Sequence, residues 1–252
     1  MARLLASAVV ACLLAAAVAS PSSDDLLGDC MEKAKLQRDD PIDQGDEGGY
    51  TVLHMAVAHN DEACLLAAVT AGADVSARTH DDGWTPLHVA AAMNKADGIR
   101  MLLAAAGRDI HHSTPQKEML AAKCNIGGTP LHWAAKDGAI ASVFTLIAHG
   151  ADVEAQAQNG ATPIFWAALD GHEGVVELLL EKNANAHHKD AEGHTVKDIA
   201  AAGCKQLLDW INDDADFETR PIVNVEPHLI VNVNHDHPGA THHHDHRVDS
   251  EL

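Results

Sequence analysis

The chain has 252 residues, with 37 acidic side chains against 17 basic ones and a formal net charge of −20 at pH 7. So acidic a balance argues against nucleic acid or an anionic membrane as a partner and favours a protein with a basic surface. Only 3% of residues are aromatic, while Ala and Leu are abundant. This composition suits thin helical layers in close contact.

Residues 1–19 have the pattern of a secretory signal peptide. Arg3 precedes an apolar run over 4–19, and the small residues Ala17 and Ala19 precede the expected cleavage point. An uncleaved anchor is the alternative, but the run is shorter than the roughly 20 apolar residues of a spanning helix. We expect a secretory-pathway protein, in the endoplasmic reticulum lumen or outside the cell, with no membrane contact after cleavage.

The next segment, 24–49, is polar, and 24–37 is predicted to be helical and to cap the array of repeats that follows. Beyond the signal peptide the cysteines are Cys30, Cys64, Cys124 and Cys204. In an oxidising compartment they could form two disulfides by any of three connectivities, and the sequence does not choose among them. For Cys64 we predict a small buried hydrophobic side chain.

A short motif then recurs at intervals of about 33 residues, with one extra stretch of about ten. Its copies are 49–56 (GYTVLHMA), 83–90 (GWTPLHVA), 128–135 (GTPLHWAA), 160–167 (GATPIFWA) and 193–200 (GHTVKDIA). The motif threonine is suited to cap a helix, and the proline after it to the first helical position. A second helix is expected to end about 21 residues after the threonine, at Gly72 and Gly150. In the fourth repeat Asn183 replaces this glycine. Both residue types are suited to the left-handed conformation that ends a helix.

These motifs resemble the ankyrin repeat, whose signature is Thr-Pro-Leu-His-x-Ala. The resemblance implies an all-α solenoid of about five helix-turn-helix-loop repeats over 50–212. It also implies a protein interaction module that binds a partner on a concave surface of loop tips and first helices, without chemistry of its own.

The histidines His54, His88 and His132 recur once per repeat, too far apart to share a metal ion. We expect each imidazole to hydrogen-bond the neighbouring turn. Phe165 and Asp198 occupy the same position in later repeats. A structural position tolerates such replacements, whereas a catalytic one would not. No Ser/His/Asp or Cys/His pairing suggests an activated nucleophile, so no catalytic residue is predicted.

Partner contacts are expected at the five loop tips, three of which are acidic, although solvation alone also explains acidic turns. The candidates are Asp46, Glu47, His80, Asp81, Asp82, Asn125, Ile126, Gln158, Asn159, Asp190 and Glu192. The extra stretch, near 111–124, is predicted to form a helical turn or two capped by Ser113 or Thr114, with Pro115 at its first position. This insertion either contributes to partner binding or is a surface-loop insertion without a function of its own.

The fifth repeat is degraded, as suits a C-terminal cap, and 205–212 is amphipathic. From 213 to 252 we expect an acidic, His-rich and weakly ordered tail, in which 221–226 and 229–234 alternate like short strands. No cofactor is expected, except that a histidine tract in this tail is suited to bind Zn²⁺, Ni²⁺ or Cu²⁺. The alternative function is therefore that of a metal-binding or pH-responsive protein that acts through the tail. The tract consists of His235, His237, His242, His243, His244 and His246. The sequence ends in Asp-Ser-Glu-Leu, at 249–252. Its Glu-Leu matches the endoplasmic reticulum retrieval signals Lys-Asp-Glu-Leu and His-Asp-Glu-Leu, whereas its first two residues differ from them.

Overall fold

The computed structural model describes residues 28–32, 41–106, 115–201 and 204. The chain divides into units 1–215 and 216–252, and every described residue belongs to the first. The predicted signal peptide, the 205–212 helix, the possible strands and the histidine tract therefore lie outside the described residues.

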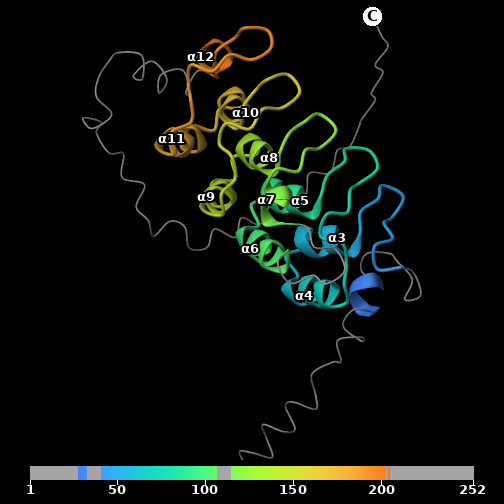
Figure 1. Ribbon diagram of the computed structural model, residues 1–252. Coiled ribbons are helices and arrows are strands. Elements are labelled where there is room, and N and C mark those ends of the chain that lie inside the picture. The colour runs from blue at the N-terminus through green and yellow to red at the C-terminus, as the bar shows by residue number, and fades with distance from the viewer. Residues whose placement is uncertain (1–27, 33–40, 107–114, 202–203, 205–252) are drawn as a thin grey trace, which may run out of the picture. The chain divides into compact units, whose positions relative to one another are not determined.

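Paired antiparallel helices build the first unit. The helices are α3 (Val52–Ala58), α4 (Glu62–Thr70), α5 (Pro86–Ala92), α6 (Ala96–Ala105), α7 (Gln116–Leu120), α8 (Pro130–Lys136), α9 (Ile140–Ala148), α10 (Pro163–Asp170), α11 (Glu173–Glu181) and α12 (Val196–Ile199). Figure 1 shows an inner row of α3, α5, α8, α10 and α12 beside projecting hairpin loops, and an outer row of α4, α6, α9 and α11. The predicted all-α ankyrin-type solenoid is confirmed.

Each inner helix begins where the motif predicts. The residue before the helix is the motif threonine in extended conformation, at Thr51, Thr85, Thr129, Thr162 and Thr195. Proline occupies the first turn of α5, α8 and α10. Its fixed φ fits this position, and its missing N–H is not needed there.

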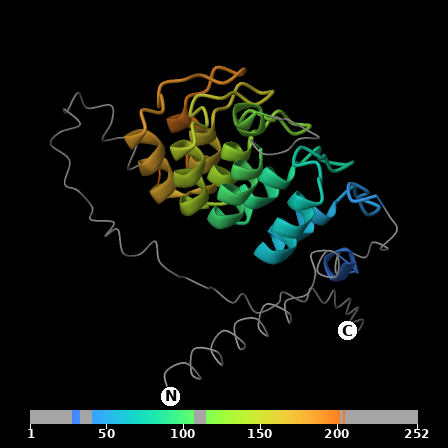
Figure 2. The same cartoon turned by 60° about the horizontal axis from the view of Figure 1, so that its bottom comes forward.

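The outer helices also end as predicted. Gly72 and Gly150 have φ of 88° and 93°, and Asn183, which replaces glycine after α11, has φ of 64°. This left-handed conformation lets the chain leave the helix and start the next hairpin loop. The same unit can then repeat, so that the paired helices stack side by side (Figure 2).

The core lies between the two rows. The first four motifs place an aliphatic residue at the same buried position, and Leu53, Leu87, Leu131 and Ile164 are at most 1% exposed. In α4, Leu65 is 3% exposed and belongs to the core, whereas Leu66 beside it is 59% exposed. Adjacent helical residues are separated by about 100°, so only one of the two leucines can face the core.

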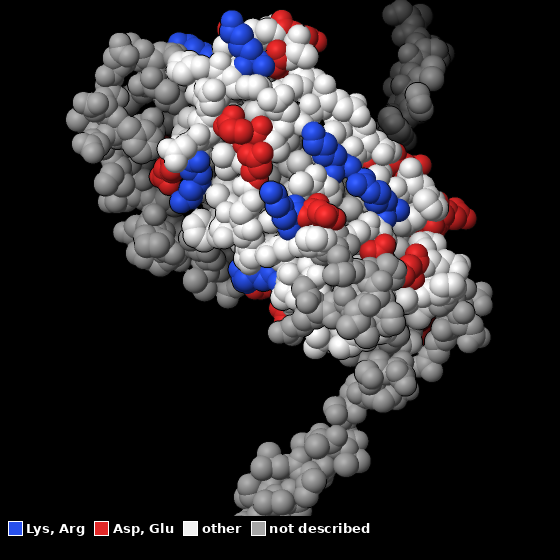
Figure 3. Space-filling view, in the orientation of Figure 1, with Lys and Arg blue, Asp and Glu red and all other residues white. Residues whose placement is uncertain are grey.

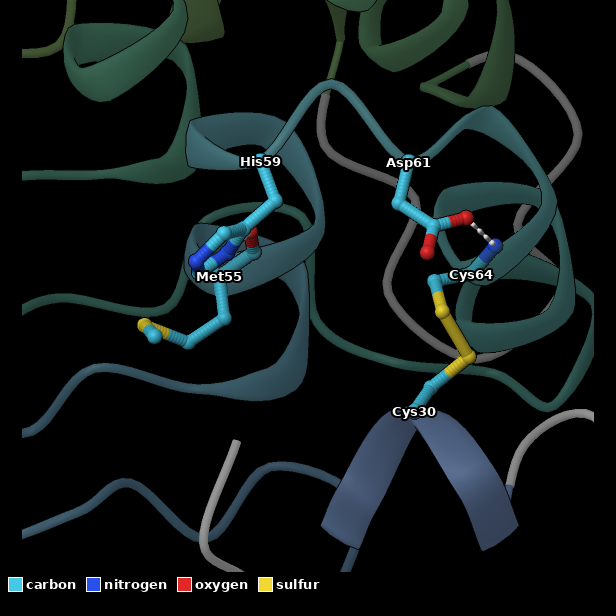
Figure 4. The surroundings of a disulfide bond; sticks show 5 residues. All are labelled: Cys30, Met55, His59, Asp61 and Cys64. Atoms are coloured by element: carbon cyan, nitrogen blue, oxygen red, sulfur yellow. Dashed lines mark hydrogen bonds between the residues drawn. A yellow bond between two sulfur atoms is a disulfide. The ribbon is translucent and has the colours of Figure 1, made fainter. Parts of the chain in front are cut away.

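A disulfide joins Cys30, in the helical residues 28–32, to Cys64 in α4 across 34 residues of sequence (Figure 4). The prediction that Cys64 is only a small buried hydrophobe was therefore wrong, although both sulfurs lie in residues that are just 3% exposed. The described part of the cap also buries Met31 against the core. A covalent bond thus attaches the N-terminal segment to the first repeat, while Cys124 and Cys204 are free and buried.

The extra stretch between the second and third repeats contains α7, as predicted. Pro115 precedes this helix as its N-cap, one position earlier than expected, and Ser113 and Thr114 lie outside the described residues. Met119 and Leu120 are 3% and 5% exposed. The described part of the insertion therefore adds to the core. Among the residues that can be described, no helix is long and apolar enough to span a membrane.

Candidate protein-binding surface

The hairpin tips are joined into one continuous row. In each pair of neighbours, a backbone N–H of the later tip donates to a carbonyl of the earlier one at 2.8 to 3.2 Å. The pairs are His80 to Gly48, Asn125 to Asp82, Gln158 to Ile126 and Ala191 to Asn159. Because every tip is held by its neighbour, the row presents its side chains in a fixed order along one edge of the array.

Several predicted contact residues use their polar atoms to hold this row. Asp46 and Asp190 each accept two backbone N–H groups of their own hairpin at 2.8 to 3.0 Å. The amide groups of Asn125 and Gln158 each donate to a carbonyl of the preceding tip at 2.6 Å. The His80 ring lies 3.3 Å from the carbonyl oxygen of the first tip. These side chains therefore shape the tips, whatever else they contact.

Other candidates are exposed at the tips, namely Glu47, Asp81, Asp82, Ile126, Asn159 and Glu192. Ile126 is 51% exposed, so the middle tip presents an apolar side chain to solvent. At the first two tips the acidic groups lie close to Tyr50. Burial raises the pKa of Tyr50 above its ordinary value, and the carboxylates of Asp82, Asp46 and Asp81 raise it further. Four of the candidate carboxylates, those of Asp46, Glu47, Asp81 and Asp82, thus lie at the first two tips.

A row of three indoles, Trp84, Trp133 and Trp166, follows the inner helices beside the hairpins. We call it the tryptophan row. Ring centroids of Trp84 and Trp133 are 4.4 Å apart, and those of Trp133 and Trp166 are 5.4 Å apart and perpendicular. A Cβ at Gly128 would lie 2.8 Å from the Trp166 ring and 3.3 Å from Nε1 of Trp133. Glycine at this position therefore lets the two indoles meet.

The tryptophan row was missing from the sequence-based candidates. All three indoles are partly exposed. The signal that points to them is the recurrence of Trp133 and Trp166 one residue after the histidine position of successive motifs. Such a position lies beside its counterpart when repeats stack.

Further exposed side chains continue this surface. Leu169, in the last turn of α10, is 57% exposed, and Met93, which follows α5, is 48% exposed. Lys136 Nζ lies 5.6 Å from the Trp133 ring centroid and 3.9 Å from Oδ2 of Asp170. The indoles, Leu169 and Met93 thus form an apolar strip beside the hairpin tips, with Lys136 and Asp170 next to it. We call the tips, the tryptophan row, Leu169 and Met93 together the inner surface.

The motif histidines are structural, as predicted. His54, His88 and His132 are fully buried, and each Nδ1 accepts the backbone N–H of the motif threonine at 3.1 or 3.2 Å. That acceptor role places the proton on Nε2, which donates to a carbonyl of the next repeat at 3.1 Å. Burial lowers the pKa of each ring to about 4, so all three are neutral at pH 7.

The fourth motif breaks this pattern, because Phe165 replaces the histidine. The Oγ1 atoms of Thr51, Thr85 and Thr129 lie 2.8 or 2.9 Å from a histidine Nδ1. In contrast, Oγ1 of Thr162 is buried without a hydrogen-bond partner. Phenylalanine in place of histidine therefore leaves the Thr162 hydroxyl without a hydrogen-bond partner.

Charged groups of both signs are interspersed over a mostly uncharged surface in the view of Figure 3. Within the described ranges, no group of three or more His, Cys, Asp or Glu side chains is placed to hold a metal ion.

Comparison with known proteins agrees with this architecture. A family model described as ankyrin repeats (3 copies) matches residues 14–114 and 131–220. The chain is 26% identical over 191 residues to transient receptor potential cation channel subfamily A member 1 of Drosophila melanogaster, covering 75% of this chain and 15% of the channel. It is 32% identical over 111 residues to the nuclear factor NF-kappa-B p105 subunit of Gallus gallus, covering 44% of this chain and 10% of that protein.

A B-cell lymphoma 3 protein homolog of Mus musculus is 27% identical over 174 residues, covering 68% of this chain and 36% of that protein. The chain therefore spans about a third of the length of this relative and much less of the other two. What the relatives share with it is the repeat array. The recurring threonine caps, the buried histidines and the match over most of the sequence place the chain in the ankyrin-repeat family.

Proposed function

We propose that this protein is a non-enzymatic interaction module that binds a protein partner on its inner surface. The observation that carries the proposal is the tryptophan row, which lies beside hydrogen-bonded hairpin tips and is continued by the exposed side chains of Leu169 and Met93. Tryptophan is enriched among the residues that contribute most to protein binding, because its large apolar ring is desolvated on contact.

Rigidity supports the same conclusion. Each indole packs against the next, and each tip is tied to its neighbour, so little conformational freedom remains to be lost on binding. Ankyrin-repeat proteins generally act through protein–protein interaction. The partner that fits this chain best carries a basic surface, because negative charge is concentrated around Asp46, Asp81 and Asp82.

The disulfide supports a secretory location for this function. Bonds such as Cys30–Cys64 persist in oxidising compartments, whereas cytosolic thiols are kept reduced. Together with the predicted signal peptide, this favours the endoplasmic reticulum lumen or the extracellular space. The alternative function, metal binding at the histidine tract, stays a prediction because the tract lies outside the described residues.

The test uses the full chain as bait. A partner captured from the secretory compartment is purified, and its binding kinetics are measured with the wild-type chain and with Leu169→Glu. We expect this variant to weaken binding about tenfold or more, since it places a charge in the apolar strip. Leu66→Glu is the matched control, because Leu66 is equally exposed, at 59%, but belongs to the outer helix α4.

Charge is tested separately with Asp81→Asn combined with Asp82→Asn. Their backbone carbonyls hold the next tip, and these bonds survive the substitution. We expect a slower association rate and a weaker salt dependence, with an unchanged thermal midpoint. Equal binding by the wild type, Leu169→Glu and the double variant would exclude the inner surface as the binding site.

A further inference from the structure

The outer helix α9 (IASVFTLIA) contains no charged residue, although it lies on the solvent side of the array. Its outward positions Ile140 and Phe144 are 45% and 49% exposed, and Ala148 continues the same line one turn later. We call these three residues the apolar stripe. A surface helix normally carries polar side chains on the face away from the core. The apolar stripe therefore requires an explanation other than packing within the array.

The next outer helix has the opposite character at the same positions. Glu173, Glu177 and Glu181 of α11 are spaced four residues apart and form what we call the acidic ridge. Like charges at this spacing destabilise a helix slightly, and of the three only Glu173, in the first turn of α11, is favoured by the helix dipole. In the described part of the chain, none of the three carboxylates forms an ion pair.

The apolar stripe and the acidic ridge lie side by side. Figure 1 shows α9 and α11 as neighbours in the outer row, and residues of the two helices are in contact. The Ile140 side chain would be 3.2 Å from a Cβ placed at Gly174, and Lys182 Nζ lies 6.0 Å from the Phe144 ring centroid. Because equivalent positions of stacked repeats are adjacent, the acidic ridge runs alongside the apolar stripe, and Lys182 is a cation near Phe144.

From this juxtaposition we infer a second interaction surface, which binds a basic amphipathic helix of a partner protein. Apolar side chains of that helix cover Ile140 and Phe144, while its Lys or Arg side chains meet the acidic ridge. The stripe is two turns long, about 12 Å, which suits a partner helix of about ten residues or more. A helix that is apolar on one side and basic on its flank matches both rows at once.

Charge also distinguishes this occupant from a second copy of the chain. Each copy has a formal net charge of −20, so self-association brings together two strongly acidic molecules. A basic helix instead relieves the repulsion among the three glutamates. The surface faces away from the hairpin tips, and the inference stands independently of the inner surface.

The test measures binding of a fluorescent model helix to the full-length chain by anisotropy. The probe is a 14-residue peptide with leucines on one face and lysines beside them. One control peptide has the same composition in scrambled order, and another has glutamate in place of lysine. We expect the basic helix to bind and both controls to bind at least about tenfold more weakly.

Matched variants locate the site. Phe144→Glu introduces the residue type that the next repeat carries at this position, Glu177, so the fold is expected to tolerate it. It should weaken binding about tenfold, whereas Leu66→Glu, at the corresponding position of the first repeat, should leave binding unchanged. Replacing the three ridge glutamates with Gln should weaken binding and flatten its salt dependence. Circular dichroism and the thermal midpoint verify that each variant is folded.

Four results would overturn the inference. Equal binding of the basic and acidic helices, or equal loss in Phe144→Glu and Leu66→Glu, would show that the apolar stripe is not a specific site. A dimer in sedimentation experiments that is lost in Phe144→Glu would assign the stripe to a second copy. Cross-linking from a photoreactive residue at position 144 to residues 213–252 of the same chain would assign it to the tail.

Discussion

Acid should unfold this protein through its three motif histidines. His54, His88 and His132 are buried and neutral, and their pKa values are lowered by burial to about 4, against 6.5 for an unperturbed ring. Between these two values the unfolded chain binds protons that the folded chain does not. The histidine contribution to stability is therefore present above about pH 6.5 and is lost as the pH falls towards about 4.

The size of the effect follows from linkage. Going from about pH 7 to about pH 5, each buried histidine costs about 2 kcal/mol of unfolding free energy, and the three together about 5 to 6 kcal/mol. This is comparable with the whole stability of many domains. Urea unfolding followed by circular dichroism at a series of pH values measures the slope.

Two substitutions make the expectation specific. His132→Gln should reduce the slope of unfolding free energy against pH by about a third, because one of three titrating rings is gone. Phe165→His should steepen it by a similar amount, since it adds a fourth buried ring beside Thr162 Oγ1, which has no partner. The slope is informative even though both variants alter stability at neutral pH. An identical slope in the wild type and both variants would refute the assignment of acid sensitivity to the motif histidines.

Leu131→Ala should lower the unfolding free energy by about 2 to 5 kcal/mol, whereas Leu169→Ala, at a site that is 57% exposed, should change it by less than about 0.5 kcal/mol in urea titrations. Thr129→Val should cost about 1 kcal/mol because it removes the hydroxyl that contacts His132 Nδ1, although the backbone N–H bond to that ring stays. Thr162→Val should be neutral or stabilising, because the Thr162 hydroxyl has no partner. Equal losses in thermal melts would contradict this difference. Cys30→Ser should lower the unfolding free energy by about 2 to 4 kcal/mol under oxidising conditions and by little in a reducing buffer, since it removes the disulfide only where that bond can form.

The repeating parts of the fold were predictable because each is set by local chemistry. The motif threonine precedes a helix in every repeat, and Gly72 or Asn183 ends one by adopting a conformation that other residues resist. The bond from each motif histidine to the next turn was also predictable, because repetition at a fixed interval excludes a shared metal ion. These inferences need only one repeat and its neighbour.

Features that depend on a particular pair of side chains were not predictable. Four cysteines allow several pairings, and only the folded arrangement brings Cys30 next to Cys64. The two leucines of α4 look equivalent in the sequence, and the direction of the helix decides that Leu66 faces outward. The tryptophan row requires Gly128 to leave room for the rings of Trp133 and Trp166, a condition set by contacts between two repeats.

The disulfide gives the solenoid a direction of unfolding. A linear stack can open from either end, since an end unit has a neighbour on one side only. At the N-terminal end the Cys30–Cys64 bond keeps the cap attached to the first repeat even when noncovalent contacts break. At the other end α12 has only four residues, and no covalent link appears among its described neighbours. Fraying therefore proceeds from the C-terminal repeats towards the N-terminus, and amide exchange should be fastest in α12 and slow down repeat by repeat towards the disulfide.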